Sequence, residues 1–521
     1  MNPPVFERGR VHVWAVAPAL LVAVIVFHRA LGVFFAADDL VALARVAHLE
    51  PTPLTFRPLS AVLAFRLQHS LFGLDPFGYH MVNLALHLTA VVGVYALAHD
   101  LARRTGVAAG AALLFAASGI AFTPVHWVSG IGDLLACNLL LAATLVYRNG
   151  RQHDRTGLLA AAVVLACAAM LAKESAIAWP LVVAYLEWRN RPAPGRAPVL
   201  WPAAVAALAM GAWWALTRPH DPAAGAYAAT WAPGHLVQNL LTYLKWSITI
   251  WDPHRDRVAA ADPAAWAIGT LVGVGALLAV RQLRDTQPRT LECGLAWFVA
   301  FLLPVLPLLR HTYLYYLYIP SAGMTVAVAA LGAGWLDRVG GRIAGIAAVA
   351  ALVAVVLVEM RGVDLRQGAT VDELPADRTL RESLLLRNVT TALQAATLPA
   401  GTEVGFVNPV ARPRFDLVRA APTRAGDFDR RRSYLPLEEV LKDGRALRLF
   451  TPGLVSKGFA VTIPDEWADV ECFLYEQRGY LRRWGRGRTA LMEQGMWQRS
   501  LGQFAGAESS FARARARSGN R

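Results

Sequence analysis

Long apolar stretches fill the first 360 residues of this chain and constrain its fold more than any other feature. A helix needs roughly 17 to 25 mostly apolar residues to cross the hydrocarbon core of a bilayer. About eleven stretches meet this requirement. They lie near residues 11–35, 78–99, 106–122, 131–147, 157–172, 175–189, 198–217, 264–282, 290–309, 314–333 and 343–360. The chain is 55% apolar with a mean hydropathy of +0.38, more than soluble domains usually carry. The sequence therefore predicts an all-α polytopic membrane protein.

The positions of arginine and lysine predict the orientation, because positive residues are retained on the cytoplasmic side of short loops. With the N-terminus inside, the segments expected in the cytoplasm are rich in arginine: Arg8, Arg10, Arg103, Arg104, Arg148, Arg151, Arg155, Arg189, Arg191, Arg196, Arg281, Arg284, Arg289, Arg338 and Arg342. The opposite loops are longer and sparser in charge, and an odd number of spans places the C-terminal tail outside. We read the first apolar run as a span rather than a cleaved signal peptide. The alanine- and arginine-rich composition favours a bacterial inner membrane.

The C-terminal tail, residues 361–521, has a mixed charged and apolar sequence and is long enough for a separate small domain. Residues 403–407 and 459–463 have the pattern of short strands, and 378–397 and 435–442 that of helices. We expect an extracytoplasmic α+β domain. Its end, about residues 490–517, has the spacing of half a tetratricopeptide repeat, and an ordinary amphipathic helical hairpin is the alternative.

Net charge and cysteine content argue against two classes of protein, nucleic-acid-binding proteins and disulfide-rich domains. The net charge of +14 is explained by topology and by a tail of mixed sign, so we expect no nucleic-acid partner. Of the four cysteines, Cys137, Cys167 and Cys293 fall within predicted spans and leave Cys472 alone in the tail. No disulfide framework is expected.

An acidic pair, Asp38-Asp39, begins the first extracytoplasmic loop, about residues 36–77. The pair could simply cap a helix or lie in a solvated turn. Arg57 follows in the same loop, and His80, Asn83 and His87 share one face at the start of the second span. Polar groups entering the hydrocarbon region normally turn toward the bundle interior or a watery cavity. We expect His80 and Asn83 to line such a cavity. Helix–helix hydrogen bonding is the alternative for these side chains, and we favour it for His87.

Further polar residues are predicted on the same side of the membrane. His126 and Asp133 could ligate a divalent cation alongside the acidic pair, although no tight metal-ligand spacing is present and a helix-capping role is the alternative for Asp133. Lys173 and Glu174 could form a local ion pair. Arg310 and His311, at the outer end of the ninth span, could hold an anion.

A carboxylate pair and several cationic side chains on one membrane face match what transfer of a sugar from a lipid-linked phosphate donor would require. A carboxylate can take the proton from an attacking hydroxyl, while cationic groups stabilise the departing phosphate. The same residues could line the pathway of a lipid or glycolipid transporter, although we see no repeated halves or broken helices in matching positions. A third alternative is an inactive scaffold that binds partners through its tail.

Residues 56–99 resemble the corresponding region of transmembrane proteins with tetratricopeptide repeats that are related to protein O-mannosyltransferases. Other pieces follow in the family's order: Asp38-Asp39, His126 to Asp133-Leu134-Leu135-Ala136, Lys173-Glu174 and Tyr318-Ile319-Pro320-Ser321. The family belongs to the GT-C membrane glycosyltransferases. The resemblance implies an acidic catalytic residue in the first extracytoplasmic loop and a polyprenyl-phosphate sugar as donor.

Carried onto this sequence, the resemblance implies Asp38 or Asp39 as the catalytic carboxylate, with Asp38 preferred. Arg57 and His80 would line the same cavity, and Lys173 and Arg310 would meet the donor phosphate. The chain departs from the family at Thr123-Pro124 and Ile131 and has at most one repeat unit. The expected function is an inverting glycosyl transfer to an exported protein, a lipid or a glycan, next to membrane lipids and without a firmly expected cofactor.

Overall fold

The computed structural model describes residues 9–52, 57–190, 199–217, 228–248, 263–282, 288–309, 311–371, 374–407, 437–475 and 480–517. The chain divides into two compact units. The first contains residues 1–32, 53–68 and 77–368, and the second contains residues 33–52, 69–76 and 369–521. The acidic loop thus belongs to the same unit as the C-terminal tail.

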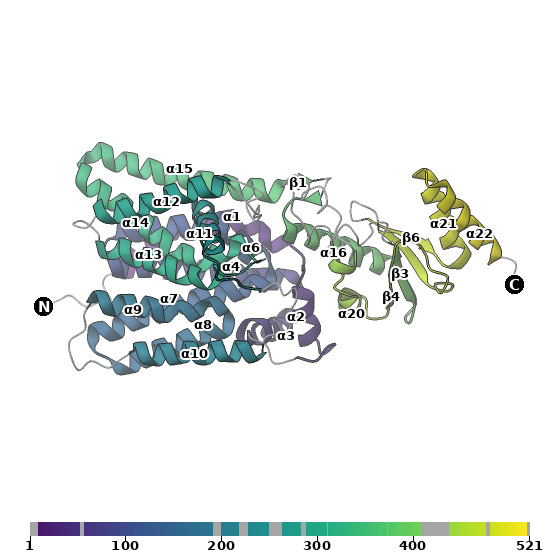
Figure 1. The fold of residues 1–521 in the computed structure, drawn as a ribbon, viewed down its shortest axis with the longest axis horizontal. Coiled ribbons are helices and arrows are strands. Elements are labelled where there is room, and N and C mark those ends of the chain that lie inside the picture. Colours follow the sequence, from purple (N-terminus) through teal and green to yellow (C-terminus); the bar gives the residue numbers. More distant parts are fainter. Residues whose placement is uncertain are drawn as a thin grey trace. The chain divides into compact units, whose positions relative to one another are not determined.

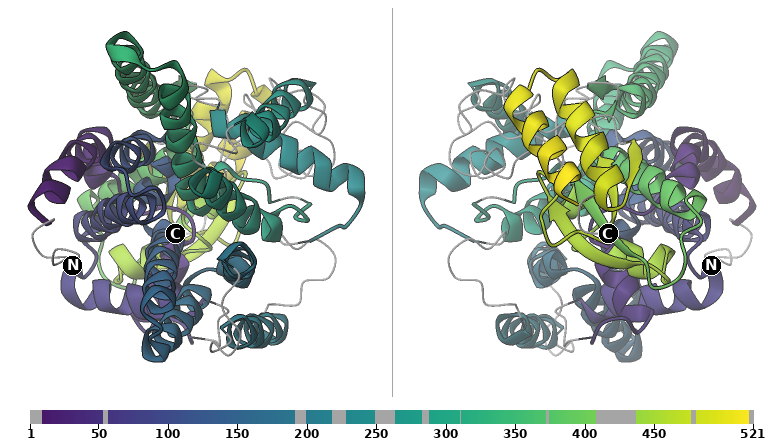
Figure 2. Two further views of the ribbon diagram at one scale, coloured as in Figure 1. Left: turned by 90° about the vertical axis from the view of Figure 1, so that its left-hand side faces the viewer. Right: turned by 90° about the vertical axis from the view of Figure 1, so that its right-hand side faces the viewer.

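The first unit is a bundle of helices (Figure 1). Its longer members are α1 (Gly9–Phe27), α4 (Pro76–Ala102), α5 (Thr105–Ala117), α7 (Ile131–His153), α8 (Thr156–Ala172), α9 (Trp179–Asn190), α10 (Leu200–Thr217), α11 (Pro233–Ile248), α12 (Pro263–Gln282), α13 (Pro288–Leu302), α14 (Tyr318–Val339) and α15 (Gly341–Gly368). Each of the predicted apolar stretches coincides with one of them. Figure 2 adds two views turned by 90°, in which several of these helices are seen end-on.

Short helical turns connect the long helices. They are η2 (His28–Gly32), η3 (Pro58–Ala64), η4 (Gly119–Ala121), α6 (Phe122–His126), η5 (Val128–Gly130), η6 (Glu174–Ala178), η7 (Leu303–Val305) and η8 (Leu314–Leu317). The helix α3 (Phe65–Phe72) continues η3, which is a π-helix. Many connections in the described part of the chain are therefore helical.

Within the described residues, five helices are long and apolar enough to cross a membrane: α1 with η2 from Trp14, α4, η5 with α7, η8 with α14, and α15. The count becomes six if α5 and the following 119–126 segment, bent by 44°, form one span. Three further apolar helices, at 156–172, 200–214 and 263–279, are shorter. The chain is a multi-pass membrane protein, while the predicted total of about eleven spans is not established.

Between the apolar stretches predicted at 198–217 and 264–282 lies a further helix, α11, which the sequence pattern did not predict. The helix lies directly against α12, where a Cβ on Gly269 would come within 2.5 Å of the Leu241 carbonyl oxygen. Polar residues such as His235, Gln238 and Asn239 interrupt its apolar pattern, so it does not stand out as a membrane span.

Small residues allow a similarly close crossing of α13 and α14. A Cβ on Gly294 would lie 2.5 Å from the Gly323 carbonyl oxygen, and one on Gly323 would lie 2.4 Å from the Gly294 carbonyl oxygen. Trp297 packs beside this crossing and donates its indole hydrogen to the Ile319 carbonyl oxygen at 2.8 Å. Backbones approach this closely in membrane bundles only where side chains are absent.

The tail has the α+β architecture expected from its sequence. Its sheet has the order β4 (Val455–Ala460), β3 (Glu403–Val407), β5 (Glu471–Tyr475) and β6 (Leu481–Gly485), with β3 parallel to β4 and β5 and β6 antiparallel to β5. A short β1 (Thr370–Val371) pairs with β2 (Leu374–Pro375). The helices in the described part of the tail are α16 (Arg378–Ala395), α19 (Leu437–Val440), α20 (Arg445–Phe450), α21 (Gly487–Ser500) and α22 (Phe504–Ala516).

Four segments of the tail have a predicted secondary structure. The strand at 403–407 matches β3, whereas the strand expected at 459–463 is β4, which begins at Val455 and ends at Ala460. The helix predicted at 378–397 is α16, and α19 lies within the one predicted at 435–442, of which residues 435 and 436 fall outside the described part. The predicted boundary at residue 360 lies inside α15, which continues to Gly368.

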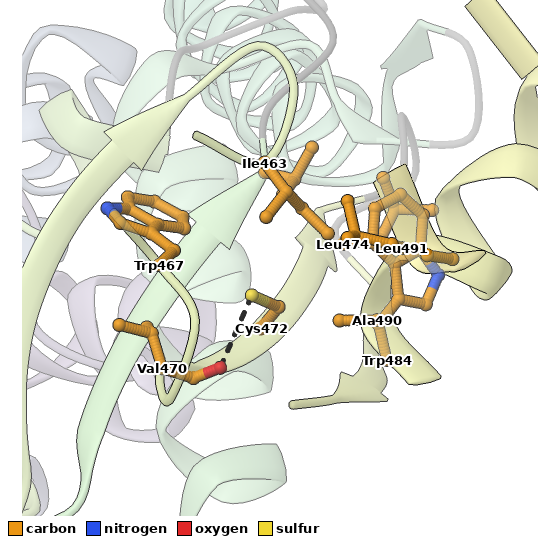
Figure 3. Packing of buried hydrophobic residues seen from close by; sticks show 10 residues of the cluster. Ile463, Trp467, Val470, Cys472, Leu474, Trp484, Ala490 and Leu491 are labelled. Atoms are coloured by element: carbon orange, nitrogen blue, oxygen red, sulfur yellow. Dashed lines mark hydrogen bonds between the residues drawn. The ribbon is translucent and has the colours of Figure 1, made fainter. Parts of the chain in front are cut away.

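A core of buried side chains joins the tail sheet to α21 (Figure 3). Leu474 from β5 and Trp484 from β6 pack with Ala490 and Leu491 from α21. The expected C-terminal hairpin is present as α21 and α22, and Gln494 Nε2 donates to Ser510 Oγ across it at 2.8 Å. The hairpin therefore docks on the domain that precedes it.

Candidate functional site

Polar side chains gather at one end of the helical bundle. Lys173, at the end of α8, binds Asp133 at the start of α7. His80, near the start of α4, contacts the Val125 carbonyl oxygen, and Arg366 at the end of α15 donates to Thr123 Oγ1 at 3.0 Å. These contacts place the ends of four helices around the 122–130 segment.

A buried ion pair forms the centre of this cluster. Lys173 Nζ lies 2.9 Å from Asp133 Oδ2, and each side chain is only 4% exposed. The ammonium also lies 5.2 Å and 5.3 Å from the ring centroids of Tyr315 and Tyr316, a distance at which it is attracted to the aromatic faces. The direct partner of Lys173 is therefore Asp133, whereas the neighbouring Glu174 has a different direct partner.

Glu174 instead pairs with Arg57, whose Nε donates to Glu174 Oε2 at 2.6 Å while Nη2 binds the other carboxylate oxygen. Burial alone would raise the pKa of Glu174, but the charges of Arg57 and Lys173 and the bond from Arg57 outweigh it and lower the pKa to about 2. The neighbouring Ser60 Oγ donates to the Ala172 carbonyl oxygen at 2.7 Å. These contacts tie η3 to the end of α8.

The role of Asn83 is to hold the 124–128 segment. Its Nδ2 lies within hydrogen-bond distance of the carbonyl oxygens of Pro124, Trp127 and Val128, at 3.2, 2.9 and 3.3 Å. His80 Nδ1 lies 3.3 Å from the Val125 carbonyl oxygen of the same segment. Both side chains are fully buried, and these contacts support the backbone of the connection.

The expected helix–helix hydrogen bond of His87 is confirmed. Its Nδ1 lies 3.0 Å from Tyr318 Oη, which joins α4 to α14. His126 is buried and stacks on Phe122 with ring centroids 4.0 Å apart, while its Nδ1 contacts the Phe122 carbonyl oxygen at 2.9 Å. Asp133 lies in the first turn of α7, yet its carboxylate accepts from Lys173.

A tyrosine-rich segment beside the ion pair was not identified from the sequence. Tyr313 and Tyr315 stack with centroids 5.3 Å apart, and His311 meets Tyr313 edge-on at 4.6 Å. Trp127 packs near Tyr315 at 6.1 Å. The clustering of tyrosine at 313, 315, 316 and 318 is the signal that could have revealed it. Arg310, the other predicted anion-binding residue here, lies outside the described residues.

The acidic pair lies in the second unit and has two different environments. Asp38 precedes the helix α2 (Asp39–Val46), and its side chain is 67% exposed, with Oδ1 3.8 Å from Lys442 Nζ. Asp39 is fully buried, and its Oδ2 accepts from the Ala36 backbone amide at 2.9 Å. One carboxylate is therefore accessible, while the other organises the turn in which Ala37 has φ of 49°.

A divalent cation gains no support from this arrangement. Among the residues that the structure describes, no three or more histidine, cysteine, aspartate or glutamate side chains are grouped as a metal site would need. His126 stacks on a phenylalanine, and the Asp133 carboxylate is bound to a lysine.

The opposite end of the bundle carries arginines paired with acids. Arg104 binds Asp337 at the end of α14, Arg148 binds Asp100 at the end of α4, and Arg189 binds Glu292 in α13. Arg151 and Glu187 form a further pair there. Four of the arginines that the sequence assigns to cytoplasmic segments, Arg104, Arg148, Arg151 and Arg189, thus have acidic partners.

Comparisons with known proteins give partial matches. No protein-family model matches the chain. Protein O-mannosyl-transferase Tmtc1 of Drosophila melanogaster is 40% identical over 124 residues, which are 24% of this chain and 14% of that protein. Protein O-mannosyl-transferase Tmtc2 of the same fly is 36% identical over 150 residues (26% and 16%), and human TMTC1 is 35% identical over 134 residues (24% and 15%). The chain thus spans about one seventh of the relatives it matches.

Two solved structures share a distant likeness. The crystal structure of ArnT from Cupriavidus metallidurans bound to undecaprenyl phosphate gives a TM-score of 0.47 at 14% identity, with 90% of this chain and 93% of that chain covered. An oligosaccharyltransferase of Archaeoglobus fulgidus, tethered to an acceptor peptide, gives 0.43 at 13% identity, with 76% and 61% covered. The resemblance expected from the sequence is confirmed by the curated relatives: over about a quarter of its length, this chain is similar to the TMTC protein O-mannosyl-transferases.

Proposed function

We propose that this chain is an integral membrane glycosyltransferase of the GT-C type. It would transfer a sugar from a polyprenyl-phosphate donor to an acceptor on the non-cytoplasmic face of the membrane. The observation that carries the proposal is the 40% identity over 124 residues to a protein named as an O-mannosyl-transferase. The multi-pass bundle with charged side chains buried at one end is consistent with it.

In the proposed reaction, a carboxylate takes the proton of the acceptor hydroxyl as its oxygen attacks the anomeric carbon of the sugar. The bond from that carbon to the phosphate oxygen breaks, and polyprenyl phosphate leaves with the electron pair. Attack on the face opposite the leaving group inverts the anomeric carbon. Cationic groups near the phosphate would stabilise its developing charge.

The exposure of the acidic pair supports Asp38 as the base. A base must reach the substrate proton, and the Asp38 side chain is two-thirds exposed whereas Asp39 is fully buried. Asp39 would act as a positioning residue, because its carboxylate binds the Ala36 amide within the same turn. Substituting the two residues should therefore have different consequences.

Among the cations, Arg57 is a better candidate for the donor phosphate than Lys173. The Arg57 side chain is 22% exposed, whereas that of Lys173 is 4% exposed and bound to Asp133. A planar guanidinium can hold one carboxylate and still present N–H groups to a second anion. Arg310 and His311 remain proposed contributors, and His80, Asn83, His126 and Asp133 would support the site from within the bundle.

The grouping of arginines at one end supports the proposed orientation. The end with Arg104, Arg148 and Arg189 would face the cytoplasm, and the end with the Asp133–Lys173 pair would face outward. We propose a bacterial inner membrane as the location. The acceptor would be a serine or threonine hydroxyl of an exported protein, with a lipid or a glycan as the alternatives.

Reconstitution with defined donors tests the proposal. Purified protein in liposomes would be given a panel of polyprenyl-phosphate sugars together with peptide and lipid acceptors, and the transferred sugar would be measured. Asp38→Asn should abolish turnover in a folded protein. Asp465→Asn, at an aspartate 87% exposed in the same unit, is the matched control and should stay active.

Two outcomes contradict the proposal. Full turnover by Asp38→Asn would remove Asp38 from the reaction. Absence of transfer with every donor, together with movement of the lipid between leaflets, would favour the transporter.

A further inference from the structure

Ion pairs connect the segment that follows the acidic pair and α2 to the C-terminal domain. Glu50, four residues after α2, receives hydrogen bonds from two arginines of α20: Arg445 Nε donates to Oε2 at 3.1 Å, and Arg448 Nη2 donates to Oε1. Burial would raise the pKa of Glu50, but the bonds from Arg448 and Arg445 outweigh it and lower the pKa. One carboxylate thus connects the acidic loop to two successive turns of a tail helix.

Aromatic packing fastens the other end of the same loop. Phe450, the last residue of α20, lies 5.2 Å from Phe34 and 6.0 Å from Phe35 between ring centroids. Phe35 is fully buried, and the Phe34 backbone amide donates to Ser383 Oγ of α16 at 2.7 Å. The acidic pair is therefore held on both sides, by Phe34 and Phe35 before it and by Glu50 after it.

A turn of unusual backbone conformation lies beside Asp38. Three consecutive residues have positive φ: Lys442 (47°), Asp443 (56°) and Gly444 (84°). Residues other than glycine seldom adopt this conformation, and such strain persists only where the surrounding structure fixes it. The turn ends α19, begins α20 and brings Lys442 Nζ within 3.8 Å of Asp38 Oδ1.

We propose that the C-terminal domain is a positioning element of the acidic loop. Glu50 and Phe450 fix α2, and Lys442 orients the Asp38 carboxylate. The predicted effect on catalysis rests on the proposed function. The predicted effect on the stability of α2, which we call the mechanical part of the proposal, does not. It assigns the tail a task that requires neither a repeat array nor a partner protein.

Hydrogen exchange measures the mechanical part. The backbone amides of Val41 and Ala42 both donate to the Asp38 carbonyl oxygen in the first turn of α2. In Glu50→Gln, we expect these amides to exchange about tenfold faster, because the side-chain amide carries no charge and offers one acceptor oxygen where the carboxylate offers two to the arginines of α20. Glu493→Gln, which weakens the Arg482 pair on α21, is the matched control and should leave α2 unchanged.

The exchange result decides the proposal irrespective of activity. Unchanged exchange in α2 of Glu50→Gln overturns it. The β5 amides report whether the tail is still folded. Faster exchange in β5 would mean that Glu50→Gln has loosened the whole tail. In that case Arg448→Gln, which removes one of the two bonds to Glu50, replaces it, and unchanged exchange in α2 of this variant overturns the proposal.

Lys442→Gln tests the orienting role of the lysine. We expect kcat to fall about tenfold with little change in KM, because the lysine acts on the carboxylate rather than on substrate binding. Lys457→Gln, at a lysine that pairs with Glu403 in the same domain, should retain the wild-type kcat. An unchanged kcat in Lys442→Gln overturns this role, and so does an equal loss in Lys457→Gln. If wild type shows no transfer with any donor, the proposed function fails, while the exchange experiment still decides whether the tail holds the loop.

Discussion

Replacing Lys173 with methionine should destabilise the helical unit by about 3 to 5 kcal/mol, because the buried Asp133 carboxylate loses its cation. Both side chains are 4% exposed, so water cannot take the place of the lysine without a rearrangement. Methionine keeps most of the length of the stem, and its contacts with Tyr315 and Tyr316 can persist. The perturbation is therefore mainly electrostatic.

The magnitude follows from two opposing terms. At the observed 2.9 Å and an effective dielectric constant near 20, the pair attracts by about 6 kcal/mol. Burial of the two ions costs several kcal/mol each, so the intact pair is worth little compared with an apolar pair. Removing one partner leaves the desolvation cost of the other. The double variant Lys173→Met with Asp133→Leu should therefore lie within about 1 kcal/mol of wild type.

Unfolding of the purified protein in mild detergent, followed by tryptophan fluorescence during titration with a denaturing detergent, measures these differences. Arg29→Met is the matched control, because its pair with Asp364 is about half-exposed and should contribute at most about 1 kcal/mol. A loss below about 1 kcal/mol in Lys173→Met would refute the reasoning. So would a double variant as unstable as the single one.

Three further predictions address other parts of the molecule. Asn83→Leu should lower the unfolding free energy by about 2 kcal/mol, because the carbonyl oxygens of Pro124, Trp127 and Val128 lose their donor; thermal unfolding in detergent checks this against Thr89→Val on the exposed face of α4. Gly323→Leu should disrupt the crossing of α13 and α14 and lower thermal stability, because even a Cβ there would lie 2.4 Å from a backbone oxygen. Gly332→Leu is the control on the same helix and should leave thermal stability unchanged, because a Cβ at Gly332 meets no atom within 4 Å. Burial would raise the pKa of Glu471, but its bonds to Arg483 and Arg486 lower it below 4.5, so the stability it contributes is present above about pH 4.5 and is lost as the pH falls through the folded pKa. Glu471→Gln should remove that acid dependence, measured as hydrogen exchange of β5 in the full chain, and an unaltered pH profile would contradict it.

Local sequence pattern was sufficient for most of the secondary structure. Apolar run length located every long helix of the bundle except α11, whose apolar positions are mixed with His235, Gln238 and Asn239. The strand β3 and the helix α16 match their predicted positions because alternation and helical periodicity are properties of a short window. The end of β4 differs, since the sheet rather than the local pattern decides where pairing stops.

The residues of the candidate site could be predicted only in part from the sequence. Residue type and expected side of the membrane were enough to select Arg57, His80, Asn83, Asp133 and Lys173, which the structure brings to one end of the bundle. Their partners were not predictable, because Lys173 binds a residue 40 positions away rather than its neighbour. The tyrosines beside Lys173 also come from a distant segment, and the cation–π contact appears only when that segment is packed.

The sequence by itself determined that this is a multi-pass membrane protein with an α+β tail, and that part of it resembles the TMTC O-mannosyl-transferases. Hydrophobic length and local periodicity carry that information, since each acts within a single segment. Only the tertiary structure decided which charges neutralise each other and that the loop with Asp38 and Asp39 packs with the tail that follows nearly 330 residues later. Each of these contacts joins residues that are far apart in the chain, so a long loop must close to form it. Local sequence preferences do not distinguish the correct partner from other charged or aromatic residues, and packing of the helices and the sheet selects it.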